Sequence, residues 1–121
     1  YICQAGYYIN QHVKKCSECP KGFYKPEKDD RTSCISCKVG TYAPRVALTS
    51  CLHCEAGKYQ PRVSSLNCLR CRIGHFVNAS GAERCLACSP GTYAPRMNAT
   101  SCLHCGTLSY APLPAMFRCY D

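Results

Sequence analysis

The sequence predicts a small disulfide-rich protein: an elongated rod of about seven tandem one-disulfide modules, with short irregular β-hairpins and almost no helix. The first observation behind this prediction is a ladder of six Cys-x-x-Cys pairs, whose leading cysteines recur at one constant interval from Cys34 onward. A fixed period of this kind is typical of repeat proteins. The second observation is a shortage of apolar side chains, since Leu, Ile, Val and Phe account for only 20 of the 121 residues. Burial alone is therefore too small to order the chain.

Covalent cross-links are expected to replace the missing core. Cysteine makes up 14 of the 121 residues, a density typical of disulfide scaffolds, and an even number leaves none obliged to be free. Because disulfides persist in oxidising compartments, we expect the chain to be secreted or to lie on the extracellular face of the cell surface. Two Asn-x-Ser/Thr sequences agree with this location and predict N-linked glycans at Asn78 and Asn98.

Charge and hydropathy argue against two further classes. The net charge is +8, but no basic run is longer than Lys14-Lys15, so a nucleic-acid partner is not expected. No apolar stretch approaches the roughly 18 residues that a membrane span needs, so no transmembrane segment is expected in this chain. Because the chain begins and ends beside a cysteine, we expect it to be a piece of a larger surface or matrix protein.

Each module is predicted to start with the motif Cys-x-x-Gly-x-aromatic, which occurs six times; a seventh copy has Leu108 in the glycine position. Glycine suits a turn with positive φ or a close approach of two backbones. The aromatic residue supplies the one large apolar surface of the module. In five copies a proline follows and limits the length of the strand, and turn-forming residues occupy the middle of the module. These features together predict one small hairpin per module.

A longer repeat overlies the short one. The segment 41–54 recurs as 92–105, three modules later, with 11 of 14 positions identical. We interpret this as the duplication of a three-module block, and a function that recurs every third module is the alternative.

The lone cysteines at the two ends, Cys3 and Cys119, constrain a pairing that sequence alone does not fix. If the second cysteine of each pair joins the first of the next pair, every cysteine is used. Interlocked pairings across two modules remain an alternative. The offset pairing predicts the disulfides Cys3–Cys16, Cys19–Cys34, Cys37–Cys51, Cys54–Cys68, Cys71–Cys85, Cys88–Cys102 and Cys105–Cys119.

This pairing divides a single array, residues 1–121, into modules at about 3–16, 19–34, 37–51, 54–68, 71–85, 88–102 and 105–119. Closing one loop of about 15 residues contributes roughly 3 kcal/mol in the chain-entropy model. We expect each module to contact only its immediate neighbours, which predicts an elongated shape.

The motif Cys-x-x-Gly-x-Tyr, followed by a loop and then Cys-x-x-Cys, resembles the ephrin-receptor-like cysteine-rich repeat, which is akin to the one-disulfide modules of tumour-necrosis-factor receptors. The resemblance covers essentially the whole chain; the departures are Leu108 and the absence of proline at Asn10 and Asn78. It implies an extracellular array for adhesion, recognition or spacing, and it supplies no catalytic residues.

The cysteine pairs are also compatible with chemistry other than scaffolding. Two Cys-x-x-Cys pairs could supply a four-cysteine zinc site, and Cys-x-x-Cys also serves in redox catalysis. The lone end cysteines argue against zinc, and the absence of a βαβ pattern argues against redox catalysis. His53 and His104, each within Cys-Leu-His-Cys, lack a third catalytic group. We therefore expect no enzymatic activity, metal or cofactor.

The expected function is that of an extracellular, non-enzymatic structural or adhesion rod, acting as a spacer or an interaction surface. Arg45, Arg62 and Arg96 each follow Tyr-x-Pro, so they could form a basic stripe for an anionic glycan or an acidic protein surface; a solvated face is the alternative. One alternative function is a ligand-binding receptor ectodomain in which loop tips such as 26–31 contact a protein. Another is a subunit that assembles with copies of itself into an extracellular fibre.

Overall fold

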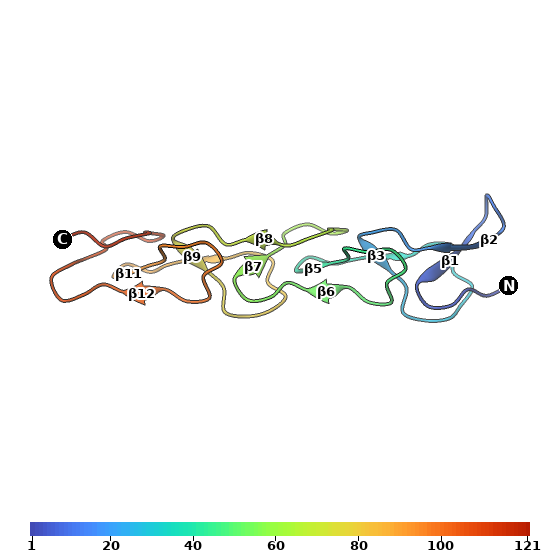
Figure 1. Ribbon diagram of the computed structural model, residues 1–121, viewed down its shortest axis with the longest axis horizontal. Coiled ribbons are helices and arrows are strands. Elements are labelled where there is room, and N and C mark those ends of the chain that lie inside the picture. The colour runs from blue at the N-terminus through green and yellow to red at the C-terminus, as the bar shows by residue number, and fades with distance from the viewer.

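The computed structural model describes all 121 residues and shows a long, thin rod with its two termini at opposite ends (Figure 1). Its regular secondary structure consists of six antiparallel two-stranded hairpins, without a helix. Seven disulfides follow one another along the rod and use all fourteen cysteines. The predicted fold class is confirmed.

The first hairpin is longer than the others. It pairs β1 (Tyr7–Asn10) with β2 (Lys15–Glu18), four residues each. The next five hairpins have strands of two residues: β3 (Phe23–Tyr24) with β4 (Ile35–Ser36), β5 (Thr41–Tyr42) with β6 (Leu52–His53), β7 (Lys58–Tyr59) with β8 (Leu69–Arg70), β9 (His75–Phe76) with β10 (Leu86–Ala87), and β11 (Thr92–Tyr93) with β12 (Leu103–His104). In the seventh module a single bridge joins Tyr110 and Tyr120.

In the short hairpins, the aromatic residue of the motif lies opposite the residue that follows the closing cysteine, which is the second cysteine of the module's disulfide. The pairs include Tyr42 with Leu52, Tyr59 with Leu69, and Phe76 with Leu86. An aromatic side chain opposite an aliphatic one is a favourable cross-strand pair, worth a few tenths to about 1 kcal/mol. The hairpins are short, and the disulfides rather than strand length hold them closed.

The buried centre of the rod is formed mainly by two positions of the module. One is the cysteine that begins the module, which in the first six modules has no exposed surface: Cys3, Cys19, Cys37, Cys54, Cys71 and Cys88. The other directly follows the motif's aromatic residue; its buried examples are Lys25, Ala43, Gln60, Val77, Ala94 and Ala111. The core is therefore a thin line of sulfur and mostly small side chains, which explains how the chain orders itself with so few large apolar residues.

Backbone hydrogen bonds through the motif glycine connect each module to the next. The N–H of Gly57, for example, donates to the carbonyl of Val77 at 3.0 Å, and its own carbonyl accepts from the N–H of Cys71 at 3.0 Å. The same two bonds recur at each of the six motif glycines, with N···O distances of 2.7–3.0 Å. The repetition pairs backbone groups at every junction without a large sheet.

Contacts also reach the second module along the chain. A methyl group on Gly57 would lie 2.5 Å from the carbonyl oxygen of Asn98, two modules ahead, and Gly57 has a φ of 90°. Equivalent close approaches pair Gly6 with Ala47, Gly22 with Ser64, Gly40 with Gly81, and Gly74 with Ala115. The expectation that modules contact only their immediate neighbours is therefore wrong, because each loop lies over two preceding modules. The predicted role of the glycine, positive φ and close backbone approach, is confirmed.

The loop residues that face the glycines share one backbone conformation. Ala47, Ser64, Asn98 and Ala115 have φ between 55° and 65°, and Gly81 has 76°, all in the left-handed region. In each case the N–H donates to the carbonyl of the buried cysteine of the preceding module, at 2.7–3.0 Å. A left-handed conformation is unfavourable for a side-chain-bearing residue. It persists here because the loop is bonded to one module and packed against another.

Candidate interaction surface

The seven disulfides lie where the offset pairing puts them, with Cα–Cα distances of 5.6–5.9 Å. Because every cysteine is paired, no thiolate is left for the four-cysteine zinc sites considered from the sequence. No group of three or more His, Cys, Asp or Glu side chains is placed to hold a metal ion. Candidate function therefore rests on the exposed side chains of the modules and on the grooves between them.

The three arginines of the predicted stripe are exposed or partly exposed and form no ion pair; each lies in the loop after β5, β7 or β11. In Figure 1, β6 and β12 run along one edge of the rod, whereas β8 runs along the opposite edge. The modules of Arg45 and Arg96 thus share an edge that the module of Arg62 does not. A common stripe of these three arginines remains a prediction.

Both predicted glycosylation sites have asparagines that reach the surface. Asn78 follows the buried Val77, and Asn98 is the left-handed residue whose backbone carbonyl faces Gly57. At Asn98 it is the backbone that packs against the rod, so the side chain stays outside. The occupancy of both sites remains a prediction.

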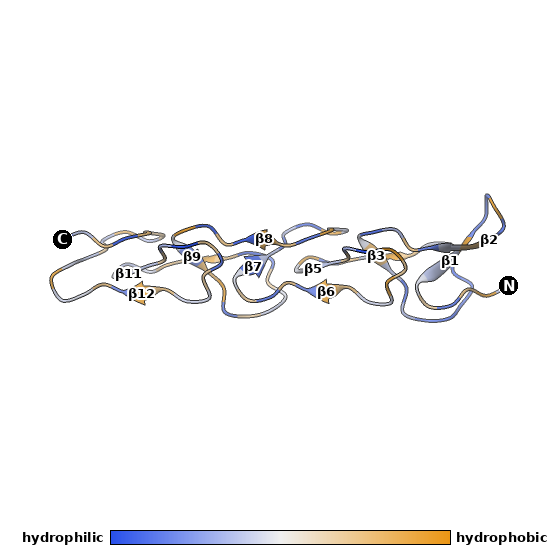
Figure 2. Cartoon of the chain, in the orientation of Figure 1, coloured by the Kyte–Doolittle hydropathy of each residue, from blue (hydrophilic) through white to orange (hydrophobic).

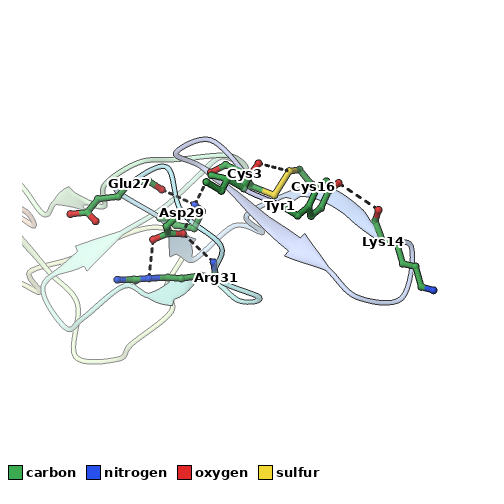
Figure 3. The surroundings of a disulfide bond; sticks show 9 residues. Tyr1, Cys3, Lys14, Cys16, Glu27, Asp29 and Arg31 are labelled. Carbon is green, nitrogen blue, oxygen red and sulfur yellow. Dashed lines mark hydrogen bonds and ion pairs between the residues drawn. A yellow bond between two sulfur atoms is a disulfide. The ribbon is translucent and has the colours of Figure 1, made fainter.

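The loop 26–31, whose tip is the candidate contact of the receptor alternative, is fastened to the first module through Asp29. Asp29 and Cys3 exchange backbone N–H···O bonds of 2.9 and 3.1 Å. Beside them the fully buried Lys25 donates through Nζ to the carbonyls of Cys3 (3.3 Å) and Glu27 (2.6 Å) and to the Asp29 carboxylate (2.8 Å). Figure 3 shows Asp29 and Arg31 beside the Cys3–Cys16 disulfide.

The Asp29 carboxylate is the electrostatic centre of this cluster. Its two oxygens lie 2.8 Å from Lys25 Nζ and 3.1 Å from Arg31 Nε. The side-chain hydrogen bond from Lys25 lowers the pKa of Asp29, and the backbone N–H of Arg31 and the two positive charges act in the same direction against partial burial. Sequence reasoning missed the burial of Lys25, because a lysine before proline looks like an ordinary exposed residue.

Apolar side chains are also exposed along the rod. The residue after the closing cysteine is leucine in four consecutive modules and is exposed in each: Leu52, Leu69, Leu86 and Leu103. Figure 2 shows that hydrophobic segments alternate with hydrophilic ones along the whole rod.

Shallow grooves lie between consecutive modules, and sequence reasoning missed them. The groove between the third and fourth modules has a volume of about 240 Å³ and is lined by Tyr42, His53, Glu55, Lys58, Asn67 and Cys68. The next groove, between the fourth and fifth modules, measures about 220 Å³ and is lined by Tyr59, Arg72, His75, Arg84 and Cys85. Apart from His53, every lining position of the first groove recurs in the second after one period of the cysteine ladder. This periodicity is the signal that could have located the second groove from the first.

A tandem array of one-disulfide modules with a sulfur-lined centre defines a class of cysteine-rich repeat domain. The family described as tyrosine-protein kinase ephrin type A/B receptor-like matches the chain three times, at residues 6–46, 40–82 and 74–115. The chain therefore belongs to the ephrin-receptor-like cysteine-rich repeats, as the sequence motif predicts. A comparison with curated proteins found no matching relative.

The limits of the three matches follow the contacts between modules. Each match begins at a motif glycine, Gly6, Gly40 or Gly74, and ends within one residue of the loop position that faces this glycine two modules ahead. Each match therefore covers parts of three successive modules of this chain rather than a single disulfide loop.

The family match and the many disulfides together suggest an extracellular domain. The match brings no assignment to a catalytic family. The structure also lacks any helix long and apolar enough to cross a membrane.

Proposed function

We propose that the chain is an extracellular, non-enzymatic spacer rod, which holds neighbouring domains or surfaces at a set distance and presents its exposed side chains for adhesion. The observation that carries this proposal is the continuous overlap of modules. Each junction combines a two-residue linker, two hydrogen bonds through a glycine and, from the first to the fifth glycine, a contact with the second module ahead. Bending at one junction would therefore disturb three modules at once.

The overlap distinguishes a rod from a string of beads. In a chain of independent disulfide loops, the two residues between cysteines would act as hinges, as short flexible linkers do. Here the N–H and C=O groups beside these linkers are bonded to the adjoining modules. We therefore expect a single narrow distribution of end-to-end distances.

The test is a distance measurement between spin labels carried by unnatural amino acids at Tyr1 and Leu108, which are both exposed. Bio-orthogonal labels leave the disulfides intact. A narrow distance distribution, broadened by Gly57→Ala and unchanged by the exposed control Lys28→Ala, is the expected result. A broad distribution in the unmodified chain would overturn the proposal.

A further inference from the structure

The groove between the fourth and fifth modules, called here the module 4–5 groove and lined by Tyr59, Arg72, His75, Arg84 and Cys85, differs in charge from its neighbour. In the preceding groove, Glu55 and Lys58 form an ion pair with an O···N distance of 3.1 Å. One period later, Arg72 and His75 stand at these two positions. The acidic member of the pair has been replaced by a cation.

The basic residues of the module 4–5 groove have no acidic partner. Arg84 occupies the position of the neutral Asn67 in the preceding groove. The ion pairs of the molecule involve only Asp29 and Glu55 as acids, so neither Arg72 nor Arg84 belongs to one. Two guanidinium groups therefore line one groove without an ion-pair partner from the protein; Glu83, next to Arg84 in the chain, pairs with neither.

A disulfide holds these two arginines together. Arg72 directly follows Cys71 and Arg84 directly precedes Cys85, and the two cysteines are bonded with a Cα–Cα distance of 5.9 Å. The two cations come from opposite ends of one loop, and the covalent bond between their neighbours fixes both backbones. Both arginines therefore line the groove from fixed backbone positions, where an anion could accept hydrogen bonds from both guanidinium groups.

The remaining lining residues complete a surface for a sugar. His75 Nδ1 lies 3.2 Å from the carbonyl oxygen of Ile73, so Nδ1 carries the proton that bonds this carbonyl and Nε2 is left for another partner. Tyr59 supplies an aromatic wall. Arg70 has the sequence position that His53 has in the preceding groove, but it does not line the module 4–5 groove.

We propose that the module 4–5 groove binds a segment of a sulfated glycan, with Arg72 and Arg84 on a sulfate group and Tyr59 against the apolar face of a sugar ring. Guanidinium groups bind tetrahedral oxyanions through paired hydrogen bonds. At about 220 Å³ the groove is smaller than a typical enclosed ligand pocket, and it is open, which suits one unit of an extended polymer. An acidic protein would need a contact area of about 800 Å² on each partner for stable binding, more than a groove lined by five residues offers.

This site is separate from the spacer function and from the predicted stripe. It uses none of Arg45, Arg62 and Arg96, and a rod can hold its length without binding a glycan. Rigidity and glycan binding can therefore fail independently.

The test measures the affinity of the full chain for a heparin-derived hexasaccharide at an ionic strength of about 0.15 M. The variant Arg72→Ser/Arg84→Ser is compared with Lys21→Ser/Lys28→Ser, which removes the same charge from exposed lysines of the second module, outside both the groove and the predicted stripe. We expect a loss of about tenfold or more for the first and less than about threefold for the second. An intact mass that still includes seven disulfides verifies that both variants fold.

Two results would overturn the proposal. Equal losses in the two double variants would mean that the net charge of the rod, and not the groove, binds the glycan. The second result would be equally tight binding of an acidic peptide that carries as many sulfotyrosines as the hexasaccharide carries sulfate groups. If this binding also depended on Arg72 and Arg84, the groove would be assigned to a protein partner. For Tyr59→Leu we expect a further loss of about threefold, and an unchanged affinity would contradict the contact between Tyr59 and the sugar ring.

Discussion

The junction between the first two modules and the junctions farther along the rod are stabilised by different means. At the first junction, a buried lysine and an aspartate fasten the loop 26–31 to Cys3. Farther along, the backbone of a left-handed loop residue bonds to a buried cysteine and packs against a glycine two modules back. The second module also has its own disulfide spacing, a sequence separation of 15 against 13 in the first module and 14 elsewhere.

This difference shows that a loop of the next module must bond to each buried cysteine, whereas the interactions that hold this loop in place can be either side-chain or backbone contacts. The backbone solution can be repeated in many sequences because it requires only a glycine. The side-chain solution requires specific charges and therefore adds a dependence on pH. Four substitutions or changes of condition separate the two solutions, and they are ordered here from the largest expected effect to the smallest.

Gly57→Ala is expected to have the largest effect. A side chain at φ 90° is strained, and its methyl group would meet the carbonyl oxygen of Asn98 at 2.5 Å. Strain and overpacking together should cost about 3 kcal/mol. Native-state hydrogen exchange at the Asn98 N–H, which donates to Cys71, measures the loss locally.

Gly91→Ala provides the matched control. Gly91 has a similar φ of 88°, but nothing lies within 4 Å of the position of its missing methyl group. Only the backbone strain remains, about 1–2 kcal/mol. Equal losses in the two variants would mean that the contact with the second module contributes nothing to stability.

Lys25→Met tests the first junction. The variant keeps the length of the side chain but leaves the carbonyls of Cys3 and Glu27 without this donor and Asp29 without one of its two cations. We expect a loss of about 2 kcal/mol, read from hydrogen exchange at the Asp29 N–H. Lys28→Met, at an exposed residue of the same loop, should leave this exchange rate unchanged. Faster exchange at Asn98 in the Lys25→Met variant would contradict the independence of the two junctions.

Gln60→Ala should have a smaller effect. Gln60 is buried, donates through Nε2 to the Asn67 carbonyl at 2.7 Å and accepts from the Arg62 N–H at 3.0 Å. Alanine already occupies the equivalent place in other modules, at Ala43 and Ala94. The loss should be about 1 kcal/mol, measured by thermal unfolding. A loss as large as that of Gly57→Ala would show that the side chain, and not the backbone, holds this loop.

The response to acid should be the smallest of the four effects, and it should be confined to the first junction. The pKa of Asp29 is lowered from its usual 3.8 by the hydrogen bond from Lys25, so the carboxylate stabilises the fold above that value. This contribution is lost as the pH falls through the lowered pKa. Amide chemical shifts of Cys3 and Asp29, followed from about pH 5 down to about pH 2, should move together, while those of Asn98 stay constant. Retention of this titration in Asp29→Asn would contradict the assignment.

Much of the fold follows from the sequence for a simple physical reason. The cysteine spacing is regular, and Cys3 and Cys119 at the ends favour one pairing, so the modules and their order can be predicted. The motif glycines indicate a conformation that other residues rarely adopt. The family match then confirms the resemblance seen in the motif.

The contacts between modules were harder to predict. The loop residues that cover the glycines are Ala47, Ser64, Gly81, Asn98 and Ala115. They share a backbone conformation but no side-chain chemistry, so no residue pattern marks them. Similarly, Arg72 and Arg84 are well separated in the sequence and meet only because a disulfide joins their neighbours. Side chains brought together by a cross-link carry little signal in a linear sequence.

The offset disulfides also determine how the molecule would respond to being pulled from its ends. Tension enters a module through one cysteine and leaves through its partner, so it passes across the sulfur–sulfur bond and the short linker that separates consecutive modules. The residues enclosed by each disulfide loop bear no load. Stretching can therefore extend the molecule very little while the disulfides are intact. Reduction of one disulfide would increase the extension in a discrete step, by the length of the loop that this disulfide encloses.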